Sequence, residues 1–283
     1  FNIFSLSKKV KRKIKKIKNV NYIFCDISKK EELYNKLDKY NFETVVNLSG
    51  HVNHSEWKKT YNSHFIGTKN LSTYFVKKKI KNFIQMSSSL EYSKNRVPHT
   101  EKMKINLEKL KTAYSLAKAK STKYLLKLNK KDNFPVTILR LYLAYGPKQE
   151  PNRIVPIAIK KFLLNKKIKL SDCMQVRDFL YIDDLINLLM KIISSKKSKK
   201  VIFNVGSGKP IILKFVIEYL RNKIKKGKPE YGKLSLRKDE AYKFYPNISL
   251  VKKTFKWTPK TKLEDGLTKT INFFKNENKK SIS

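Results

Sequence analysis

A tyrosine and a lysine, Tyr114 and Lys118, lie four residues apart in a segment whose apolar residues recur at helical spacing. At positions i and i+4 of a helix, two side chains share one face. A nearby ammonium group favours the phenolate and lowers the pKa of a phenol from its usual value of about 10. A tyrosine paired in this way can serve as a general acid or base near neutral pH.

The spacing itself is weakly specific, because the chain holds 15 Tyr and 65 Lys and Arg, of which only seven are Arg. Chance accounts for three such pairs, and three are present: Tyr74/Lys78, Tyr114/Lys118 and Tyr219/Lys223. Only Tyr114 lies on a predicted helix that follows a strand ending in serines 87–89 and precedes another strand. A serine hydroxyl there could hydrogen-bond a substrate carbonyl oxygen while Tyr114 transfers the proton. The alternative is a polar strand-to-loop turn.

Strand-like and helix-like segments alternate along most of the chain, and the strand-like ones are continuous apolar runs, as in parallel sheets covered on both faces. We expect strands over residues 2–6, 22–25, 44–48, 82–86, 135–140 and 201–205, and helices over 29–40, 62–79, 107–129, 152–164 and 183–193. This order predicts an α/β fold with a doubly wound parallel sheet and, from about residue 206, a smaller C-terminal subdomain. Ligands of such sheets bind beyond the carboxyl ends of the strands, which here carry Asp26 and residues 49–51, 87–89 and 142–147.

The formal net charge of +43 could reflect either a polyanion-binding surface or a composition biased towards Lys, Asn, Ile, Phe and Tyr. A nucleic-acid binder concentrates its charge and favours Arg, whose planar fork holds phosphate in two places. Here Lys is spread along the whole chain and Arg is scarce. We therefore favour compositional bias and expect no nucleic-acid partner.

The composition also bears on several classes of protein. The spacing of the eight glycines fits neither G-x-G-x-x-G nor G-x-x-x-x-G-K-[ST], so the chain carries neither a complete dinucleotide-binding fingerprint nor a P-loop. Two cysteines, Cys25 and Cys173, give no disulfide framework and favour a reducing, cytoplasmic location. No apolar run approaches the length of a membrane span. The first residue is Phe1, so we expect a processed or incomplete N-terminus.

A series of short segments forms a further pattern, in order along nearly the whole chain. The segments are Cys25-Asp26-Ile27, residues 45–50, Asn62 with residues 67–71, residues 83–92, Tyr114-x-x-x-Lys118, and residues 139–147, 177–184, 203–208, 236–240 and 257–259. Together they resemble the extended short-chain dehydrogenase/reductase family of nucleotide-sugar epimerases, dehydratases and reductases. The resemblance implies a Rossmann-like fold that begins at its second strand, without the first strand, glycine-rich loop and helix. The chain as it stands should therefore bind NAD(P) poorly.

The resemblance also implies roles for individual residues. Tyr114 would be the acid/base, Lys118 its partner and a ligand of the nicotinamide ribose, and Ser88 the catalytic serine, counted back from Tyr92, with Ser87 and Ser89 as alternates. The implied cofactor, NAD or NADP, would be held by Asp26, Ile27, Ser49, Lys118 and Lys8. The implied substrate, a nucleotide-diphosphate sugar, would be held by Ser89, Asn152, Arg153, Arg177 and Arg237. For Arg177 and Arg237 a surface salt bridge is the alternative.

Two departures from the family pattern bear on the reaction. Dehydratases of the family place an Asp and a Glu directly after the catalytic residue, where this chain has Ser89 and Leu90, so we disfavour elimination. Lys8 and Lys9 follow the first strand where NAD-selective members carry an acidic residue, which favours NADP and a reductase. The chain looks most like reductases of nucleotide-linked 4-keto-6-deoxyhexoses. A 4-epimerase and a truncated, inactive sugar-nucleotide-binding homologue are the alternatives.

The same resemblance implies a domain organisation and an assembly. We expect a cofactor domain over residues 1–148, joined by about 178–205, and a mainly substrate-binding part over 149–283. The helices over 62–79 and 107–129 would pair two copies of the chain through a four-helix bundle. Three histidines, His51, His54 and His64, come nearest to a metal site, but no carboxylate or Cys completes the set and we expect no metal.

Overall fold

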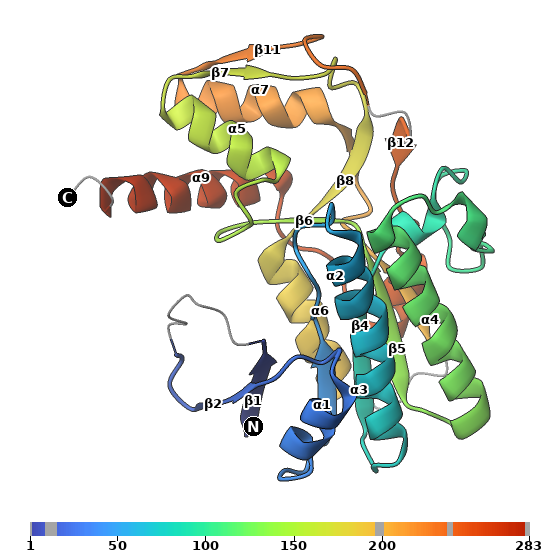
Figure 1. The fold of residues 1–283 in the computed structure, drawn as a ribbon. Coiled ribbons are helices and arrows are strands. Elements are labelled where there is room, and N and C mark those ends of the chain that lie inside the picture. Colours follow the sequence, from blue (N-terminus) through green and yellow to red (C-terminus); the bar gives the residue numbers. More distant parts are fainter. Residues whose placement is uncertain (1, 9–15, 196–200, 237–239, 281–283) are drawn as a thin grey trace. The chain divides into compact units, whose positions relative to one another are not determined.

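The structure is a computed structural model that describes residues 2–8, 16–195, 201–236 and 240–280, and it divides into two compact units (Figure 1). Unit 1 comprises Phe1–Glu91, Lys104–Arg140 and Lys196–Ile202. Unit 2 comprises Tyr92–Met103, Leu141–Ser195 and Phe203–Ser283. The predicted division into cofactor-binding and substrate-binding parts near residue 148 concerns function and stays a prediction.

Parallel strands form the frame of unit 1. They are β1 (Ile3–Ser7), β2 (Val20–Phe24), β3 (Thr44–Asn47), β4 (Asn82–Ser88) and β5 (Val136–Leu141). β1 pairs in parallel with β2, β3 pairs in parallel with β4, and β5 lies on the other side of β4. The predicted α/β class with parallel strands is confirmed. The described strands of unit 1 nevertheless form two ladders, β1–β2 and β3–β4–β5, where a single sheet was expected.

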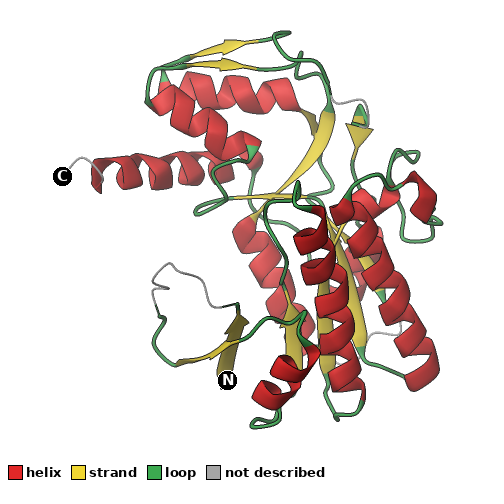
Figure 2. Cartoon of the chain, in the orientation of Figure 1, coloured by secondary structure: helices red, strands yellow, loops and turns green. Residues whose placement is uncertain are grey.

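Helices flank these strands (Figure 2). They are α1 (Lys30–Leu37), α2 (Trp57–Tyr61), α3 (Gly67–Val76) and α4 (Ala113–Asp132), with a π-helical turn η1 (Asn62–Ile66) between α2 and α3 and 3-10 turns η2 (Ser89–Tyr92) and η3 (Leu107–Lys109). The predicted helix over 107–129 begins later because Leu110 is extended and the Thr112 side chain caps α4 by accepting the Ser115 N–H. The predicted helix over 62–79 begins earlier, at Trp57, and includes the π turn.

The core of unit 1 lies between these helices and the strands. Leu33 and Leu37 are one turn apart on α1 and are buried together with Phe75 of α3 and Phe83 of β4. Burying one such side chain fully contributes about 1.5–3 kcal/mol to folding. This packing fixes the carboxyl ends of the strands, where the candidate residues of unit 1 lie.

Unit 2 contains more secondary structure than the loosened sequence pattern after residue 206 suggested. Its elements are β6 (Leu143–Tyr145), α5 (Ile154–Leu163), β7 (Lys167–Lys169), β8 (Val176–Tyr181), α6 (Ile182–Ser194), β9 (Ile202–Val205), β10 (Pro210–Ile212), α7 (Leu213–Ile224), β11 (Lys228–Glu230), β12 (Lys243–Phe244), α8 (Ser249–Phe255) and α9 (Leu263–Lys280). β8 is its central strand, antiparallel to β10 and parallel to β6 and β12. Buried side chains of α5, α7 and α9, such as Phe162, Leu220 and Phe274, form its core.

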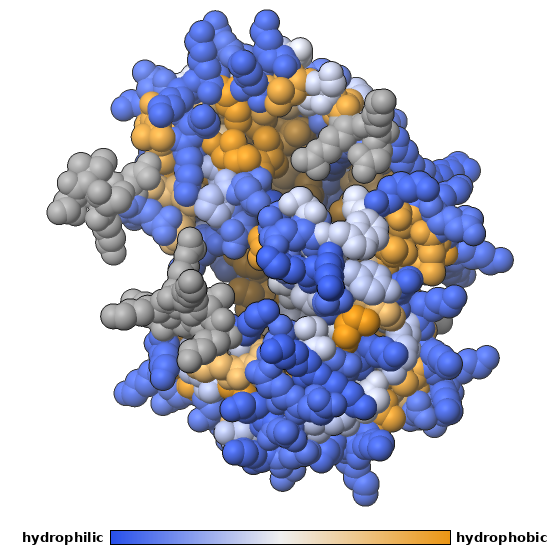
Figure 3. All heavy atoms as spheres, viewed as in Figure 1, coloured by the Kyte–Doolittle hydropathy of each residue, from blue (hydrophilic) through white to orange (hydrophobic). Residues whose placement is uncertain are grey.

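One face of the molecule shows how hydrophilic and apolar side chains are distributed. On the face drawn in Figure 3, hydrophilic side chains are spread widely, with apolar ones between them. Both cysteines, Cys25 and Cys173, are free and buried. Within the described residues, no helix combines the length and apolar character that crossing a membrane requires.

Candidate active site

Burial of the lysine distinguishes the Tyr114/Lys118 pair. Among the described residues Lys118 is the one buried lysine, with 3% of its surface exposed. Its Nζ donates a hydrogen bond to the Met86 carbonyl of β4 at 2.6 Å, two residues before Ser88. Burial lowers the pKa of Lys118 to about 8, although the charge of Glu91 opposes the shift. Lys118 therefore stands at the carboxyl end of β4, and among the described residues its ammonium group forms no ion pair with a carboxylate.

The other two pairs lack this arrangement. Lys78 and Lys223 are both exposed. The Tyr74 hydroxyl donates to Asp38 at 2.8 Å, and burial together with this carboxylate raises the pKa of Tyr74. The Tyr219 hydroxyl donates to a backbone carbonyl in unit 2. Both hydroxyls are therefore engaged by protein acceptors, and neither pair contains a buried lysine such as Lys118.

The ring of Tyr114 has three neighbours with nitrogen-bearing side chains. The Lys118 ammonium lies 5.8 Å from the ring centroid. The imidazole of His54 stacks on the ring at a centroid distance of 4.0 Å and an interplanar angle of 13°. The imidazole of His64 meets it edge-on at 4.9 Å and 84°. Sequence reasoning considered both histidines only as metal ligands and missed this contact, for which the local sequence holds no signal.

The three serines at the end of β4 are held differently. The Ser87 hydroxyl donates to the buried carboxylate of Glu91. Ser88 Oγ accepts the Leu90 N–H at 3.2 Å, and a hydroxyl that accepts in this way still has its hydrogen to donate. Ser89, the first residue of η2, is buried. The geometry therefore favours Ser88 over Ser87 as a donor to a substrate oxygen.

A buried ion pair, which the sequence did not reveal, lies behind the serines. Arg140 Nε donates to Glu91 Oε2 at 3.0 Å, and the two side chains are 3% and 0% exposed. The Thr122 hydroxyl of α4 donates to Glu91 Oε1 at 2.9 Å. Glu91 thus joins the end of β4, which carries Ser88, to α4, which carries Tyr114, and to β5.

Two predicted cofactor ligands, Asp26 and Lys8, bind each other. Lys8 Nζ lies 2.7 Å from Asp26 Oδ2, and the Ser28 backbone N–H and hydroxyl donate to Asp26 Oδ1. Burial favours the protonated carboxyl, but the hydrogen bonds from Lys8 and Ser28 outweigh it and lower the pKa of Asp26 to about 2. Asp26 is therefore an ionised acceptor two residues after the end of β2.

The other two predicted cofactor ligands in unit 1 occupy different settings. The side chain of Ile27 is buried in the core, and a Cβ atom on Gly67 would come within 2.5 Å of it. Ser49 follows β3 and is held by the side chain of Asn47, which accepts from both its N–H and its hydroxyl. Ser49 is half-buried at the strand end where the sequence placed it.

In unit 2, Arg177 is engaged by protein groups. Its guanidinium donates to Glu240 Oε1 at 2.5 Å and to the Val176 and Tyr242 carbonyls at 2.9 and 3.2 Å. Arg177 therefore forms a salt bridge, which was the alternative to binding the phosphates of the substrate. Asn152 and Arg153 are exposed immediately before α5, and Arg237 lies outside the described residues.

Two aspartates in the segment that resembles the family organise the backbone of unit 2. The buried Asp178 carboxylate accepts the N–H groups of Ser207 and Gly208 at 2.5 and 2.7 Å. Asp184 accepts the N–H groups of Lys260 and Thr261. Both carboxylates are used structurally. In the part of the chain that the structure describes, no group of three His, Cys, Asp or Glu residues could hold a metal ion.

Residues 3–206 match the protein family described as the NAD dependent epimerase/dehydratase family. The chain belongs to this family. The match confirms the resemblance to extended short-chain dehydrogenases/reductases, and the family description confirms a nicotinamide dinucleotide as the predicted class of cofactor. The residues of unit 1 fit such a group in their chemistry, because Asp26 is an ionised acceptor and the Lys118 ammonium has two N–H donors beyond the one on Met86.

Relatives within the family catalyse different reactions. A UDP-glucuronate 4-epimerase from Thermodesulfobacterium geofontis is 28% identical over 270 residues, which is 93% of this chain and 81% of the relative. A dTDP-4-dehydro-6-deoxyglucose reductase from Escherichia coli is 26% identical over 250 residues, which is 85% of this chain and 78% of the relative. The crystal structure of a UDP-glucose 4-epimerase with UDP-glucose from Thermotoga maritima has a TM-score of 0.89 at 22% identity and covers 98% of this chain and 92% of that one. This likeness confirms the predicted Rossmann-like α/β fold.

Proposed function

We propose that the protein is an NAD(P)-dependent enzyme that reduces the keto group of a nucleotide-linked 4-keto-6-deoxyhexose through Ser88, Tyr114 and Lys118. Lys118 carries the proposal. In a chain with 65 Lys and Arg residues, this lysine is buried, held on β4 and placed beside the Tyr114 ring. Burying an ammonium group without a partner carboxylate is unfavourable, and such groups are concentrated at functional sites.

Each of the three side chains has one role in this proposal. Tyr114 transfers its hydroxyl proton to the substrate oxygen as that oxygen gains electrons. Ser88 donates a hydrogen bond to the same oxygen, and the charge of Lys118 stabilises the phenolate that Tyr114 leaves. A bound nicotinamide cofactor supplies the hydride. The keto carbon gains the hydride and its oxygen gains the proton, so the product is an alcohol.

The nucleotide diphosphate would be bound largely by residues of unit 2. Arg153 and Asn152 are exposed where α5 begins, and a helix N-terminus favours an anion. Arg177 would exchange the Glu240 carboxylate for a phosphate group, because a guanidinium can hold either. Arg237 and Ser89 remain proposed substrate ligands on the resemblance alone.

Reduction and epimerisation differ in what happens to the cofactor. Ser89 and Leu90, which follow Ser88, supply no carboxylate for an elimination, so a redox step at the keto carbon is preferred. A 4-epimerase is the second candidate, and the UDP-glucuronate 4-epimerase supports it by matching more of this chain than the reductase does. A reductase consumes reduced cofactor with each turnover, whereas an epimerase consumes none overall.

A substrate panel tests both candidates with the full-length protein. Nucleotide-linked 4-keto-6-deoxyhexoses are supplied with NADH or NADPH, and cofactor oxidation is followed by absorbance. UDP-glucose and UDP-glucuronate are supplied in parallel, and their 4-epimers are measured by chromatography without added reductant. We expect cofactor oxidation with a 4-keto sugar. Epimer formation without net oxidation would replace the reductase with the epimerase.

The Tyr114→Phe variant tests the assignment of the site. It retains the ring and removes the proton that the mechanism needs, so we expect turnover to fall about 100- to 10,000-fold. Turnover at the wild-type rate in this variant, or no activity of either kind across the panel, would overturn the proposed function.

Assembly and location belong to the same proposal. We propose that two copies pair through α3 and α4, which pack side by side in unit 1 (Figure 1). Support comes from Leu126 of α4, whose apolar side chain is 36% exposed. Light scattering should give the mass of a dimer and, for Leu126→Glu, that of a monomer. We also propose a cytoplasmic location, where the free Cys25 and Cys173 stay reduced.

A further inference from the structure

The histidines around Tyr114 come from two segments that the sequence did not connect with it. His54 lies in a loop over residues 51–56, here called the His54 loop, and His64 lies on the π turn η1. Their rings contact one phenol from two directions, flat at 4.0 Å and edge-on at 4.9 Å. The rings of His54 and His64 also contact each other at 5.8 Å and 73°. The three rings therefore form one cluster.

The π turn fixes the position of His64. In this turn the Gly67 N–H bonds to the Asn62 carbonyl, five residues back, which rotates the chain relative to a regular helix. Turns of this kind occur frequently at functional sites. His64 is 5% exposed, and its Nε2 lies 3.3 Å from the His51 carbonyl. Its Nδ1 is buried and has no hydrogen-bond partner within the described part of the chain.

A glycine makes room for His64. A Cβ atom on Gly50 would lie 1.8 Å from Cε1 of the His64 ring, closer than any real contact. The backbone dihedrals of Gly50 do not require glycine, so the requirement comes from the imidazole alone. Gly50 directly follows Ser49 at the end of β3, so the strand end and the π turn fit together around this ring.

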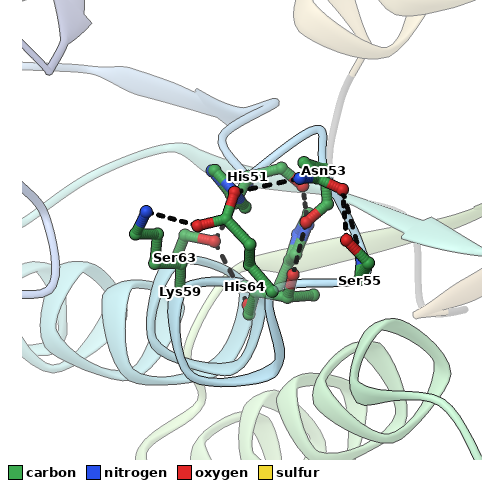
Figure 4. A network of polar contacts seen from close by, with 8 residues as sticks. His51, Asn53, Ser55, Lys59, Ser63 and His64 are labelled. Atoms are coloured by element: carbon green, nitrogen blue, oxygen red, sulfur yellow. Dashed lines mark hydrogen bonds and ion pairs between the residues drawn. The ribbon is translucent and has the colours of Figure 1, made fainter.

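Polar contacts hold the His54 loop on both sides of His54 (Figure 4). The Glu56 carboxylate lies 3.0 Å from both His51 Nε2 and Asn53 Nδ2, and it forms an ion pair with Lys59 of α2. The Asn53 side chain in turn accepts from the N–H and hydroxyl of Ser55. His54 is half-buried between these anchored residues. A loop fastened in this way can hold an imidazole flat against a neighbouring ring.

A second histidine–tyrosine stack in the chain shows what ordinary packing looks like. In unit 2, His99 stacks on Tyr92 at 4.6 Å and 21°. His99 is fully buried, and its two ring nitrogens lie 2.7 Å from the Tyr142 hydroxyl and 3.3 Å from the Asn95 carbonyl. The cluster around Tyr114 differs because it is partly exposed, contains a buried ring nitrogen without a partner, and adjoins Lys118.

We propose that His54 and His64 are positioning residues that clamp the Tyr114 ring from two sides and so fix the direction of its hydroxyl for proton transfer. The proposal rests on the proposed role of Tyr114 in the reaction. His64 is the uncharged side of the clamp, because burial and the charge of Lys118 lower its pKa to about 3. A phenol can rotate about its side-chain bonds, and small misplacements of a catalytic group reduce rates steeply.

The kinetic test compares ring-removing with ring-retaining variants in the full-length protein. His54→Ala and His64→Ala remove one side of the clamp each, and His54→Phe and His64→Phe retain an aromatic ring. We expect each Ala variant to lower kcat about 10- to 100-fold with KM for the sugar nucleotide changed less than about 3-fold. Each Phe variant should restore most of the lost kcat. Val52→Ala, at an exposed residue of the same loop that supplies none of its anchoring polar contacts, is the matched control.

A spectroscopic test reads the position of Tyr114 without any turnover. The protein is labelled with fluorotyrosine, and the Tyr114 resonance is identified by its loss in Tyr114→Phe. We expect this resonance to shift in both Ala variants and in Gly50→Ala, and to stay near its wild-type position in Val52→Ala. His54 is half-exposed, so its replacement leaves the core intact and keeps the test available if His64→Ala does not fold.

The two measurements separate failure of the clamp from failure of the proposed function. An unmoved Tyr114 resonance in His54→Ala, or an unchanged kcat in that variant, would overturn the clamp. Equal loss of kcat in His54→Phe and His54→Ala would also overturn it, because stacking would then not be the cause. Wild-type turnover by Tyr114→Phe would instead overturn the proposed role of Tyr114, while the resonance would still report whether the rings hold it.

Discussion

Unit 1 buries charge in two places, and the two places treat it in opposite ways. Glu91 and Arg140 meet at 3.0 Å, and Thr122 supplies a further hydrogen bond to the carboxylate. Lys118 is also buried, but its ammonium donates to the uncharged Met86 carbonyl and its pKa falls to about 8. The first charge is balanced locally, whereas the second is only partly compensated.

This difference distinguishes buried charges that stabilise the fold from a buried charge that serves a reaction. Removing one partner of a balanced pair leaves the other charge buried and unpaired, so both partners are needed for the fold. A buried ammonium without a carboxylate lowers stability, and it persists where the reaction requires it. Composition cannot make this distinction in a chain so rich in lysine, but burial together with hydrogen-bond partners can.

The largest effect should come from Lys118→Met, which retains length and removes charge. We expect activity to fall about 100- to 10,000-fold, because the phenolate loses its stabilising charge. The free energy of unfolding at pH 7 should meanwhile rise by up to about 3 kcal/mol, the equivalent of the lowered pKa of Lys118. Enzyme assays and urea unfolding measure the two effects. Lys123→Met, at an exposed lysine of the same helix, should leave both the activity and the free energy of unfolding close to their wild-type values.

The opposite outcome is expected at the balanced pair. Glu91→Gln retains the shape of the side chain and removes the carboxylate charge that faces the Arg140 guanidinium, so the free energy of unfolding should fall by about 3–5 kcal/mol. Glu91→Leu combined with Arg140→Met removes both charges and should recover most of that loss. Urea unfolding of the three proteins tests the comparison. If Glu91→Gln were as stable as the wild type, the pair would not be structural.

The local parts of this arrangement could be predicted from the sequence. β3, β4 and β5 lie within one or two residues of their expected bounds, because a continuous apolar run identifies a buried strand without reference to the rest of the chain. Tyr114 and Lys118 do lie on one helix, as their spacing indicated. A pair within one helical turn depends only on local geometry.

The parts that depend on distant residues could not be predicted. The sequence around Glu91 does not indicate that this residue is buried, because its burial depends on Arg140, 49 positions further along the chain. Arg177 reads equally as a phosphate ligand or a salt-bridge partner, and only the fold shows that Glu240, 63 positions away, binds it. The contact of His54 with Tyr114 likewise joins two residues that are far apart in the sequence. Each of these needs two strand ends or loops to meet, which periodicity does not report.

The pH dependence of stability offers a third way to examine the unbalanced charge. The amine of Lys118 titrates near its usual 10.5 in the unfolded chain and near about 8 in the folded protein. Between these values the unfolded chain binds more protons, so the free energy of unfolding rises with pH across this window. The full rise is about 3 kcal/mol, and below pH 8 the whole penalty remains. Subtracting the profile of Lys118→Met isolates this group, and identical slopes in the two proteins would contradict the assignment.

The smallest effect concerns the hydroxyl that completes the balanced pair. Thr122→Val retains the shape of the side chain and removes the hydrogen bond to Glu91, so the free energy of unfolding should fall by about 1–2 kcal/mol. Thr122→Ser keeps the hydroxyl and should lose less. Because Thr122 acts through the Glu91 carboxylate, its effect should shrink once the charge is gone, and Thr122→Val added to Glu91→Gln should change stability by less than it does alone. Strict additivity in this double-mutant cycle would mean that the hydroxyl stabilises α4 independently of the buried charge.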